Sequence, residues 1–221
     1  MKDVARFIMR RVLPFRERKR GLALQSALRR MAIETERSAE RGFDTSTAVL
    51  NVALFFLIAE RDIHAVKIDA LTHPDPWRRS LCARIILLTI HEWDMDKVAG
   101  QKLRQALSVA GASEDMKKVA IAALRDVRNV QRKAQKEFAF LRNATIAHRD
   151  PDALAQYNAI VGLDEMKVIA LATDFYAGAN AFINLMPKLI LQTSPGPVCW
   201  RNMSYEKPPV CQRIRHSLQT S

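Results

Sequence analysis

The sequence predicts an all-α protein, an antiparallel bundle of about five helices with a basic N-terminal arm and an irregular C-terminal tail. Only seven glycines and 7% aromatic residues occur among 221 residues, whereas sheet-rich domains need turn glycines and aromatic strand residues. Long stretches repeat apolar residues at intervals of three and four, the period of a helix buried on one side. Apolar and charged contents of 48% and 26% are typical of a globular protein.

The chain divides into three segments: a basic arm over 1–41, a helical bundle over 42–192 and a tail over 193–221. The arm holds 12 Lys or Arg against 5 Asp or Glu. Its residues favour a helix, but Pro14 and the charge cluster after it predict a break, so we expect a docked or partly mobile arm. Four prolines in the tail predict an irregular extension.

Capping residues locate the first two helices of the bundle. Asp44 and the two hydroxyl residues after it predict a helix that runs to about Lys67. Asp75 followed by Pro76 predicts another that reaches about His91, because the Asp side chain accepts unpaired amides and proline suits the first helical position.

Three further helices are predicted over 94–111, 113–142 and 164–189, opened by Asp94, Ser113 and Asp164. The second of them should bury one face, made of Met116, Val119, Ala120, Ala123, Leu124, Val127, Val130, Ala134, Phe138 and Leu141. The third should bury a stripe of Val168, Leu171, Ala172, Phe175, Ala179, Phe182 and Met186.

The net charge of +12 and the pI near 10.1 favour a polyanionic partner. The alternative is that the excess charge only keeps the protein soluble. The charge is uneven: 12 − 5 = +7 over 1–41, 4 − 1 = +3 over 195–221, and 19 − 17 = +2 between them. We therefore expect the two ends to recruit a polyanion, while any chemistry belongs to the nearly neutral bundle. Another possibility is that the arm forms an amphipathic helix that lies on the surface of an anionic membrane.

Several classes of site find little support in the sequence. The three cysteines are far apart with no CxxC pair, no glycine-rich phosphate loop is present, and no GxSxG motif occurs. We therefore expect neither a metal site nor a cofactor. The longest apolar run, 48–59, is shorter than the roughly 20 residues that cross a bilayer. No membrane span is expected, and the odd cysteine count favours a cytoplasmic protein, with Cys82 as a core residue.

A basic stripe is the first candidate functional surface. Its members lie within about 80° of one another on a helix that turns roughly 100° per residue. They are Lys118, Arg125, Arg128, Arg132 and Lys136. Such a stripe can follow an RNA backbone; the simpler interpretation is the solvated face of an amphipathic helix.

The second candidate is the segment from Arg142 to Pro151. Pro151 should end the helix near Asp150, which places His148 near a helix C-terminus. Its imidazole can exchange a proton near neutral pH, while Arg142 offers a charged fork for phosphate and Asn143 a neutral donor and acceptor. These groups suit metal-free cleavage of a phosphodiester, with His148 as base for a ribose 2′-hydroxyl.

The segment Arg142-Asn143-…-His148 resembles the signature of HEPN-domain proteins, and the Ala-His-Arg-Asp string 147–150 resembles their abortive-infection branch. The resemblance implies a small helical bundle, a homodimer, and metal-independent endoribonuclease activity in a bacterial defence or toxin–antitoxin setting, with a possible antitoxin partner. It implies that Arg142 and His148 are the catalytic pair and Asn143 their polar neighbour. With RNA as the substrate, we expect the basic stripe and Arg149 to bind it.

Alternatives to a nuclease remain. Arg142 and Asp150 can form a helix-end ion pair, with His148 as a C-cap, and inactive HEPN domains serve as binding modules. A second Arg-to-His spacing, Arg84 to His91, lacks the polar residue after the arginine. The rival function is a non-catalytic helical module that binds a protein or nucleic acid through its arm and stripe.

Overall fold

A computed structural model describes residues 2–92, 95–109, 111–147 and 151–193. These residues form helices and no strands, which confirms the all-α fold. The elements are α1 (Lys2–Glu40), α2 (Asp44–Thr72), α3 (Pro76–His91), α4 (Met95–Ala99), α5 (Gln101–Val109), α6 (Glu114–Arg142), the π-helical turn η1 (Asn143–Ala147), α7 (Ala153–Val161) and α8 (Glu165–Thr193).

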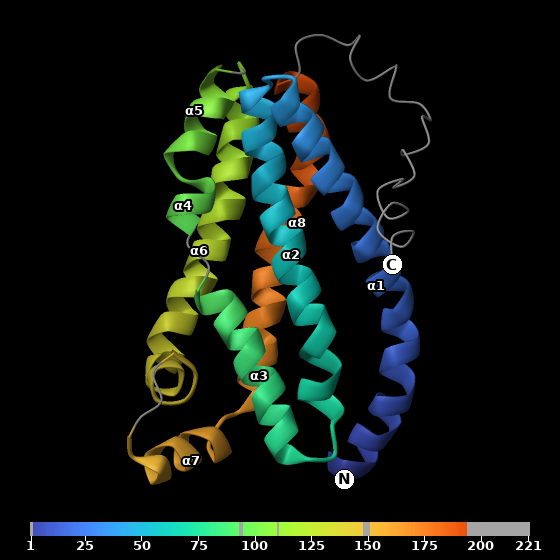
Figure 1. The fold of residues 1–221 in the computed structure, drawn as a ribbon, viewed down its shortest axis with the longest axis vertical. Helices are drawn as coiled ribbons and strands as arrows, with labels where there is room; N and C mark the ends of the chain where they lie inside the picture. Colours follow the sequence, from blue (N-terminus) through green and yellow to red (C-terminus); the bar gives the residue numbers. More distant parts are fainter. Residues whose placement is uncertain (1, 93–94, 110, 148–150, 194–221) are drawn as a thin grey trace, which may run out of the picture.

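The long helices α2 and α8 form the centre of the bundle, and the others surround them (Figure 1). α1 packs along α2, α3 packs on both central helices, and α6 packs on α8. The core is aromatic where α2 meets α8: the ring of Phe56 lies 6.4 Å from that of Phe175 and 5.5 Å from that of Phe182. None of the three side chains is exposed, so this contact fixes the two central helices against each other.

Three of the predicted caps are confirmed, but the cap expected for α2 from Asp44 and the two hydroxyl residues after it is wrong, because the N-cap is Phe43 and no side chain caps this helix. An oxygen of Asp75 accepts a hydrogen bond from the Trp77 amide at 2.9 Å, and the Ser113 hydroxyl accepts one from the Met116 amide at 3.4 Å. Asp164 accepts from the Met166 amide at 3.0 Å. Each cap satisfies an amide that has no partner within the helix.

Two predicted helices differ in their bounds. α2 runs to Thr72 instead of Lys67, because its last turns still bury Ala70 and Thr72. The helix predicted over 94–111 is divided into α4 and α5; its expected cap, Asp94, lies outside the described residues.

The predicted break at Pro14 is wrong. α1 is one helix of 39 residues with Pro14 inside it. Proline removes one helical hydrogen bond, but contacts with α2 hold the helix on either side: Leu13 is half-buried, and Glu17 pairs with Lys67. The arm is thus a docked helix along the bundle (Figure 1).

Helix α7 was not predicted. It begins after Asp152, whose side chain accepts hydrogen bonds from the amides of Leu154 and Ala155 at 2.9 and 3.1 Å. Between α6 and α7 the chain first takes a π-helical turn at Asn143–Ala147. The C-terminal tail, 194–221, lies outside the described residues.

The predicted inner stripe of α8 is confirmed, since all seven of its residues are buried. On α6 the prediction holds for most positions, but Val119 is 49% exposed, because it lies at the edge of the buried face. α8 from Glu165 to Leu191 has the length and mean hydropathy that could cross a membrane, the one such segment within the described residues. Its apolar side chains here form the core of the bundle.

Candidate functional site

Arg142 ends α6 and is held by two neighbours. Its Nε and one terminal nitrogen lie 2.9 and 2.8 Å from the same oxygen of Glu92. Its other terminal nitrogen donates a hydrogen bond to the Asn143 side-chain oxygen at 3.0 Å. The Arg142 side chain is 25% exposed, so the guanidinium is oriented by its partners yet still open to solvent.

Glu92 is the C-cap of α3, and its side chain is half exposed. The hydrogen bond from Arg142 is the main cause that lowers the pKa of Glu92, and the charges of Arg142 and His91 add to it, although partial burial opposes them. The carboxylate is therefore charged at neutral pH and neutralises the arginine.

His91, the last residue of α3, lies against the same carboxylate. Its Nδ1 is 3.2 Å from the Glu92 oxygen, without the geometry of a hydrogen bond. The His91 carbonyl accepts a hydrogen bond from Gln131 on α6 at 3.3 Å. The ends of α3 and α6 are thus joined, and the site contains Glu92 and His91, which sequence reasoning did not assign to it.

The π-helical turn η1 begins at Asn143, immediately after Arg142. Within it the Thr145 hydroxyl donates to the Leu141 carbonyl at 2.7 Å, and Ala144 is buried. A π turn widens the helix and is often found at functional sites. Its first residue, Asn143, is exposed beside Arg142.

Three residues of the predicted site, His148, Arg149 and Asp150, lie outside the described residues. The structure therefore brings Arg142 and Asn143 together, while the place of His148 relative to them and the alternative ion pair of Arg142 with Asp150 stay predictions.

The predicted basic stripe lies on the outer face of α6. Lys118, Arg125, Arg132 and Lys136 are exposed, and Arg128 is half-buried. The stripe runs along the side of the helix opposite its buried residues and leads to the exposed Asn143. It is consistent with either a track for phosphates or a solvated helix face.

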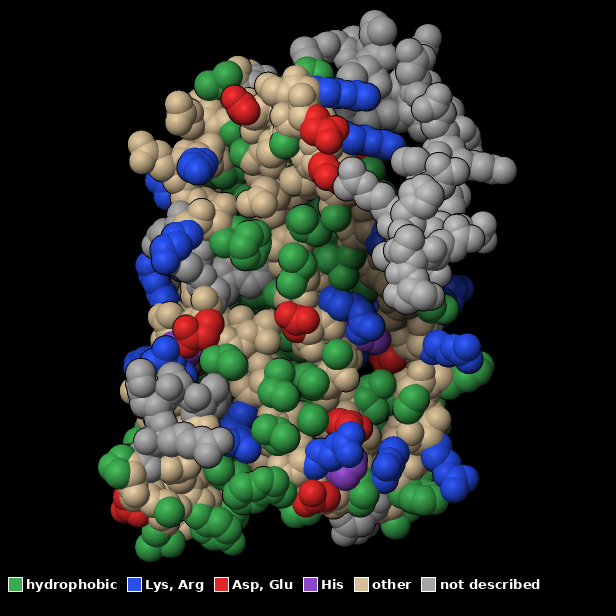
Figure 2. Space-filling view, viewed as in Figure 1, with side chains coloured by type: hydrophobic (Ala, Val, Ile, Leu, Met, Phe, Trp, Pro, Cys, Tyr) green, Lys and Arg blue, Asp and Glu red, His purple; other side chains and the backbone are tan. Residues whose placement is uncertain are grey.

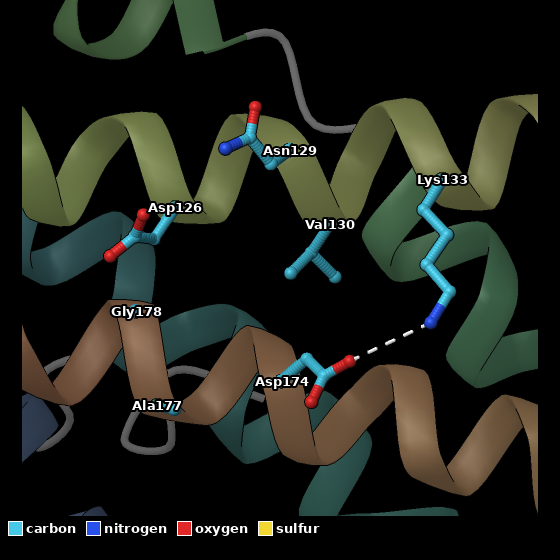
Figure 3. Close-up of a pocket in the computed structure, with 7 residues that line it drawn as sticks. All are labelled: Asp126, Asn129, Val130, Lys133, Asp174, Ala177 and Gly178. Carbon is cyan, nitrogen blue, oxygen red and sulfur yellow. Dashed lines mark ion pairs between the residues drawn. The ribbon is translucent and has the colours of Figure 1, made fainter.

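A shallow groove between α6 and α8 lies next to this stripe (Figure 3). Lys133 Nζ is 3.9 Å from an oxygen of Asp174, and Asp126 lies at the same groove. The floor is closed by Gly178, where a Cβ would come within 2.7 Å of a Val127 methyl carbon. Two carboxylates next to one lysine do not favour an anion, so we assign no ligand to this groove.

A second polar cluster, also missed by sequence reasoning, lies where α1, α2 and α8 meet. Glu17 of α1 lies 2.6 Å from Lys67 Nζ and 3.2 Å from His64 Nε2, both on α2. Burial is the main cause that lowers the pKa of His64 and that raises the pKa of Tyr176 on α8. The spacing of Glu60, His64 and Lys67, which places them on one side of α2, was the available signal.

The same cluster continues one turn along α1. Arg20 pairs with Glu60 at 2.5 Å, and its guanidinium carbon lies 5.3 Å above the Tyr176 ring. Glu60 is 4% exposed, so its charge needs this partner. The cluster holds α1 on the bundle.

Within the described residues, no group of three or more His, Cys, Asp or Glu side chains is placed to hold a metal ion. Cys82 is buried in α3, and burial raises the pKa of its thiol, which confirms the prediction of a core residue.

Comparison with known proteins adds no relative: no protein-family model, no curated protein and no solved structure matches the chain.

Proposed function

We propose that the protein is a metal-independent endoribonuclease, HEPN-like, in which Arg142, Asn143 and His148 act on RNA. The observation that carries the proposal is the arrangement at the end of α6. There Arg142 donates to Asn143 at 3.0 Å, and the helix changes to a π turn within the motif. The guanidinium of Arg142, the amide of Asn143 and the π turn η1 thus occur together in the segment that precedes His148.

The residues have distinct roles in the proposed reaction. His148 takes the proton of a ribose 2′-hydroxyl, and the resulting oxygen attacks the adjacent phosphorus. The bond to the 5′-oxygen breaks, and that oxygen takes a proton, so the products carry a 2′,3′-cyclic phosphate and a 5′-hydroxyl. Arg142 stabilises the negative charge that builds on the phosphate oxygens.

Glu92 holds Arg142 in the absence of RNA. Because its carboxylate accepts from two of the five guanidinium N–H groups, it competes with an incoming phosphate for these donors. The pair is partly exposed, and such ion pairs contribute only about 0–1 kcal/mol, so a phosphate dianion or diester can compete for the same donors.

Homodimerisation is part of the proposal. Near the motif, α7 exposes three large apolar side chains, Leu154, Tyr157 and Val161, and Phe140 on α6 is 65% exposed. Tyr157 also stacks on Trp77 of α3, with ring centroids 6.3 Å apart. Figure 2 shows this green surface over α7 at the lower left. An apolar surface at this place supports two copies meeting with their motifs adjacent.

The setting that fits this activity is bacterial defence or a toxin–antitoxin pair in the cytoplasm, with an antitoxin protein as a possible partner. In it, the stripe on α6 and Arg149 guide RNA to the motif. The excess of basic over acidic residues on that outer face supports this role.

The test is cleavage of RNA by purified protein in the presence of a chelator. His148→Ala should abolish cleavage and leave helicity and dimer mass unchanged, since loss of a general base costs about 10²–10⁴ in rate. Arg142→Ala should also abolish it, whereas Arg104→Ala, an exposed arginine on α5, should cleave at the wild-type rate. Full activity of His148→Ala, or loss of wild-type cleavage with chelator, would contradict the mechanism.

A non-catalytic module is the second candidate, and one observation favours it: Arg142 is already paired with Glu92 and Asn143. In that case the site is a structural joint between α3 and α6, and function rests on the arm and stripe. Induced expression separates the two. A nuclease should arrest growth, and Arg142→Ala should relieve the arrest, whereas a module should be harmless in both forms.

A further inference from the structure

The first half of α1 exposes large apolar side chains along the face that points away from the bundle. Phe15 is 83% exposed and Phe7 is 60% exposed. The others in this half are Val4 at 66%, Ile8 at 56%, Val12 at 46% and Leu22 at 61%. Most surfaces that face water do not gather so many large apolar residues within 19 positions of one helix.

The opposite face of the same helix is the one that packs on the bundle. Leu24, which is 7% exposed, lies nine residues after Phe15, and nine residues correspond to about 900°, or half a turn beyond two full turns. On the packed side, Glu17 and Arg20 are paired with residues of α2. The exposed apolar face therefore cannot turn inward without breaking these contacts.

Positive charges lie among these apolar side chains and beside them. Arg10, Arg11, Arg16, Arg18 and Lys19 are all exposed. The guanidinium carbon of Arg11 lies 4.9 Å above the ring of Phe7. From residue 4 to residue 22 the only acidic residue is Glu17, and its carboxylate points to His64 and Lys67. Figure 2 shows blue and green side chains together along the lower right edge, where this half of α1 lies.

We propose that residues 4–22 of α1 form an interfacial helix that binds the surface of an anionic membrane. The apolar side chains enter the boundary between headgroups and acyl chains, and the arginines and Lys19 that lie among and beside them extend to the lipid phosphates. The helix is already formed and tied to α2, so binding requires little additional ordering of the chain.

RNA fits this surface less well. Phosphate contacts use the charges alone, and bases stack on aromatic rings, so exposed Val4, Ile8, Val12 and Leu22 would stay in water. A lipid surface uses both features of the face, the apolar side chains and the surrounding positive charge. This inference concerns α1 and does not depend on the proposed nuclease site.

The experiment is sedimentation of the full chain with vesicles of phosphatidylcholine alone or mixed with phosphatidylglycerol. We expect binding to the anionic vesicles only. Phe7→Gln with Phe15→Gln, which leaves the net charge unchanged, should weaken this binding about tenfold or more. Val109→Gln, a change of an exposed apolar side chain on α5, should bind as wild type. Replacing Arg11, Arg18 and Lys19 by Gln should also weaken binding, and added salt should reduce what remains. Circular dichroism checks that each variant keeps its helicity.

Three results would overturn the proposal. The first is no sedimentation with anionic vesicles, or sedimentation that the two phenylalanine changes leave intact. The second is loss of RNA binding in the double phenylalanine variant without vesicle binding by wild type, which would assign the face to nucleic acid. The third is a dimer that this variant dissociates, again without vesicle binding, which would assign the face to a second copy of the chain.

Discussion

Arg142 at the end of α6 is held by Glu92 at the end of α3, with two nitrogens of the arginine 2.9 and 2.8 Å from one carboxylate oxygen. The two residues are 50 positions apart in the chain. The contact joins two helix ends and at the same time occupies the guanidinium that the proposed reaction needs. It is therefore the point at which a structural and a catalytic interpretation of the motif can be separated.

Glu92→Gln should strengthen RNA binding. Glutamine keeps the size of the side chain but loses the charge that competes with a phosphate, so we expect KM to fall about fivefold, the factor that corresponds to roughly 1 kcal/mol, with kcat nearly unchanged. The measurement is steady-state cleavage of a short RNA. Glu114→Gln is the control, because Glu114 is also an exposed carboxylate in an ion pair, in its case with Lys117. A large fall in kcat with unchanged KM would mean that Glu92 positions Arg142 for the reaction.

Folding stability should depend on pH through His64. Burial lowers the pKa of His64 in the folded protein below its ordinary value of 6.5. As the pH falls below 6.5, the imidazole therefore binds a proton in the unfolded chain before it does so in the folded protein. The contribution is complete above pH 6.5 and is lost as pH falls to the lowered pKa. Urea unfolding between pH 7.5 and pH 5 should show a decline, and His64→Gln should reduce its slope. An unchanged slope in the variant would contradict this assignment.

Tyr176→Phe should not destabilise the protein. The Tyr176 hydroxyl is buried without a hydrogen-bond partner, and an unpaired buried hydroxyl costs free energy. We expect the free energy of unfolding to stay the same or to rise by up to about 1 kcal/mol. Tyr157→Phe, at an exposed ring on α7, should change it by less than about 0.5 kcal/mol. A loss of more than ~1 kcal/mol in Tyr176→Phe would show that the hydroxyl is needed in the polar cluster.

Gly178→Ala should destabilise the contact between α6 and α8. A Cβ at this position would lie 2.7 Å from a Val127 side-chain carbon and 3.1 Å from the Val127 backbone nitrogen. The side chain can shift, but the backbone nitrogen belongs to a packed helix, so we expect a loss of about 1–3 kcal/mol in urea unfolding. Ala177→Ser adds one atom on the exposed side of the same helix and should have little effect. Equal stability of Gly178→Ala and wild type would mean that the two helices separate easily.

The parts of the fold that local chemistry determines were predictable. Asp75 before Pro76, Ser113 and Asp164 each marked a helix start, because a side-chain cap acts within three residues of itself. The burial of the α8 stripe followed from its period. Asp152 is a cap of the same kind, but the short α7 behind it lacks a long apolar period, and it was missed.

The parts that depend on contacts between distant segments were not predictable. Pro14 alone predicts a break in the helix, yet α1 is continuous because it packs along α2. The sequence identified Arg142 and Asn143, but not Glu92 or His91, which reach the motif only through the packing of α3 on α6. The cluster around Glu17 and His64 likewise exists only once α1 lies on α2.

The most direct measurement for the proposed function is the chemistry of the RNA ends after incubation with purified protein and a chelator. Mass spectrometry of the fragments should find 2′,3′-cyclic phosphates paired with 5′-hydroxyls, and neither should form with His148→Ala. Fragments with 3′-hydroxyl and 5′-phosphate ends, the same cyclic ends from His148→Ala, or intact RNA with the wild-type protein would contradict the account.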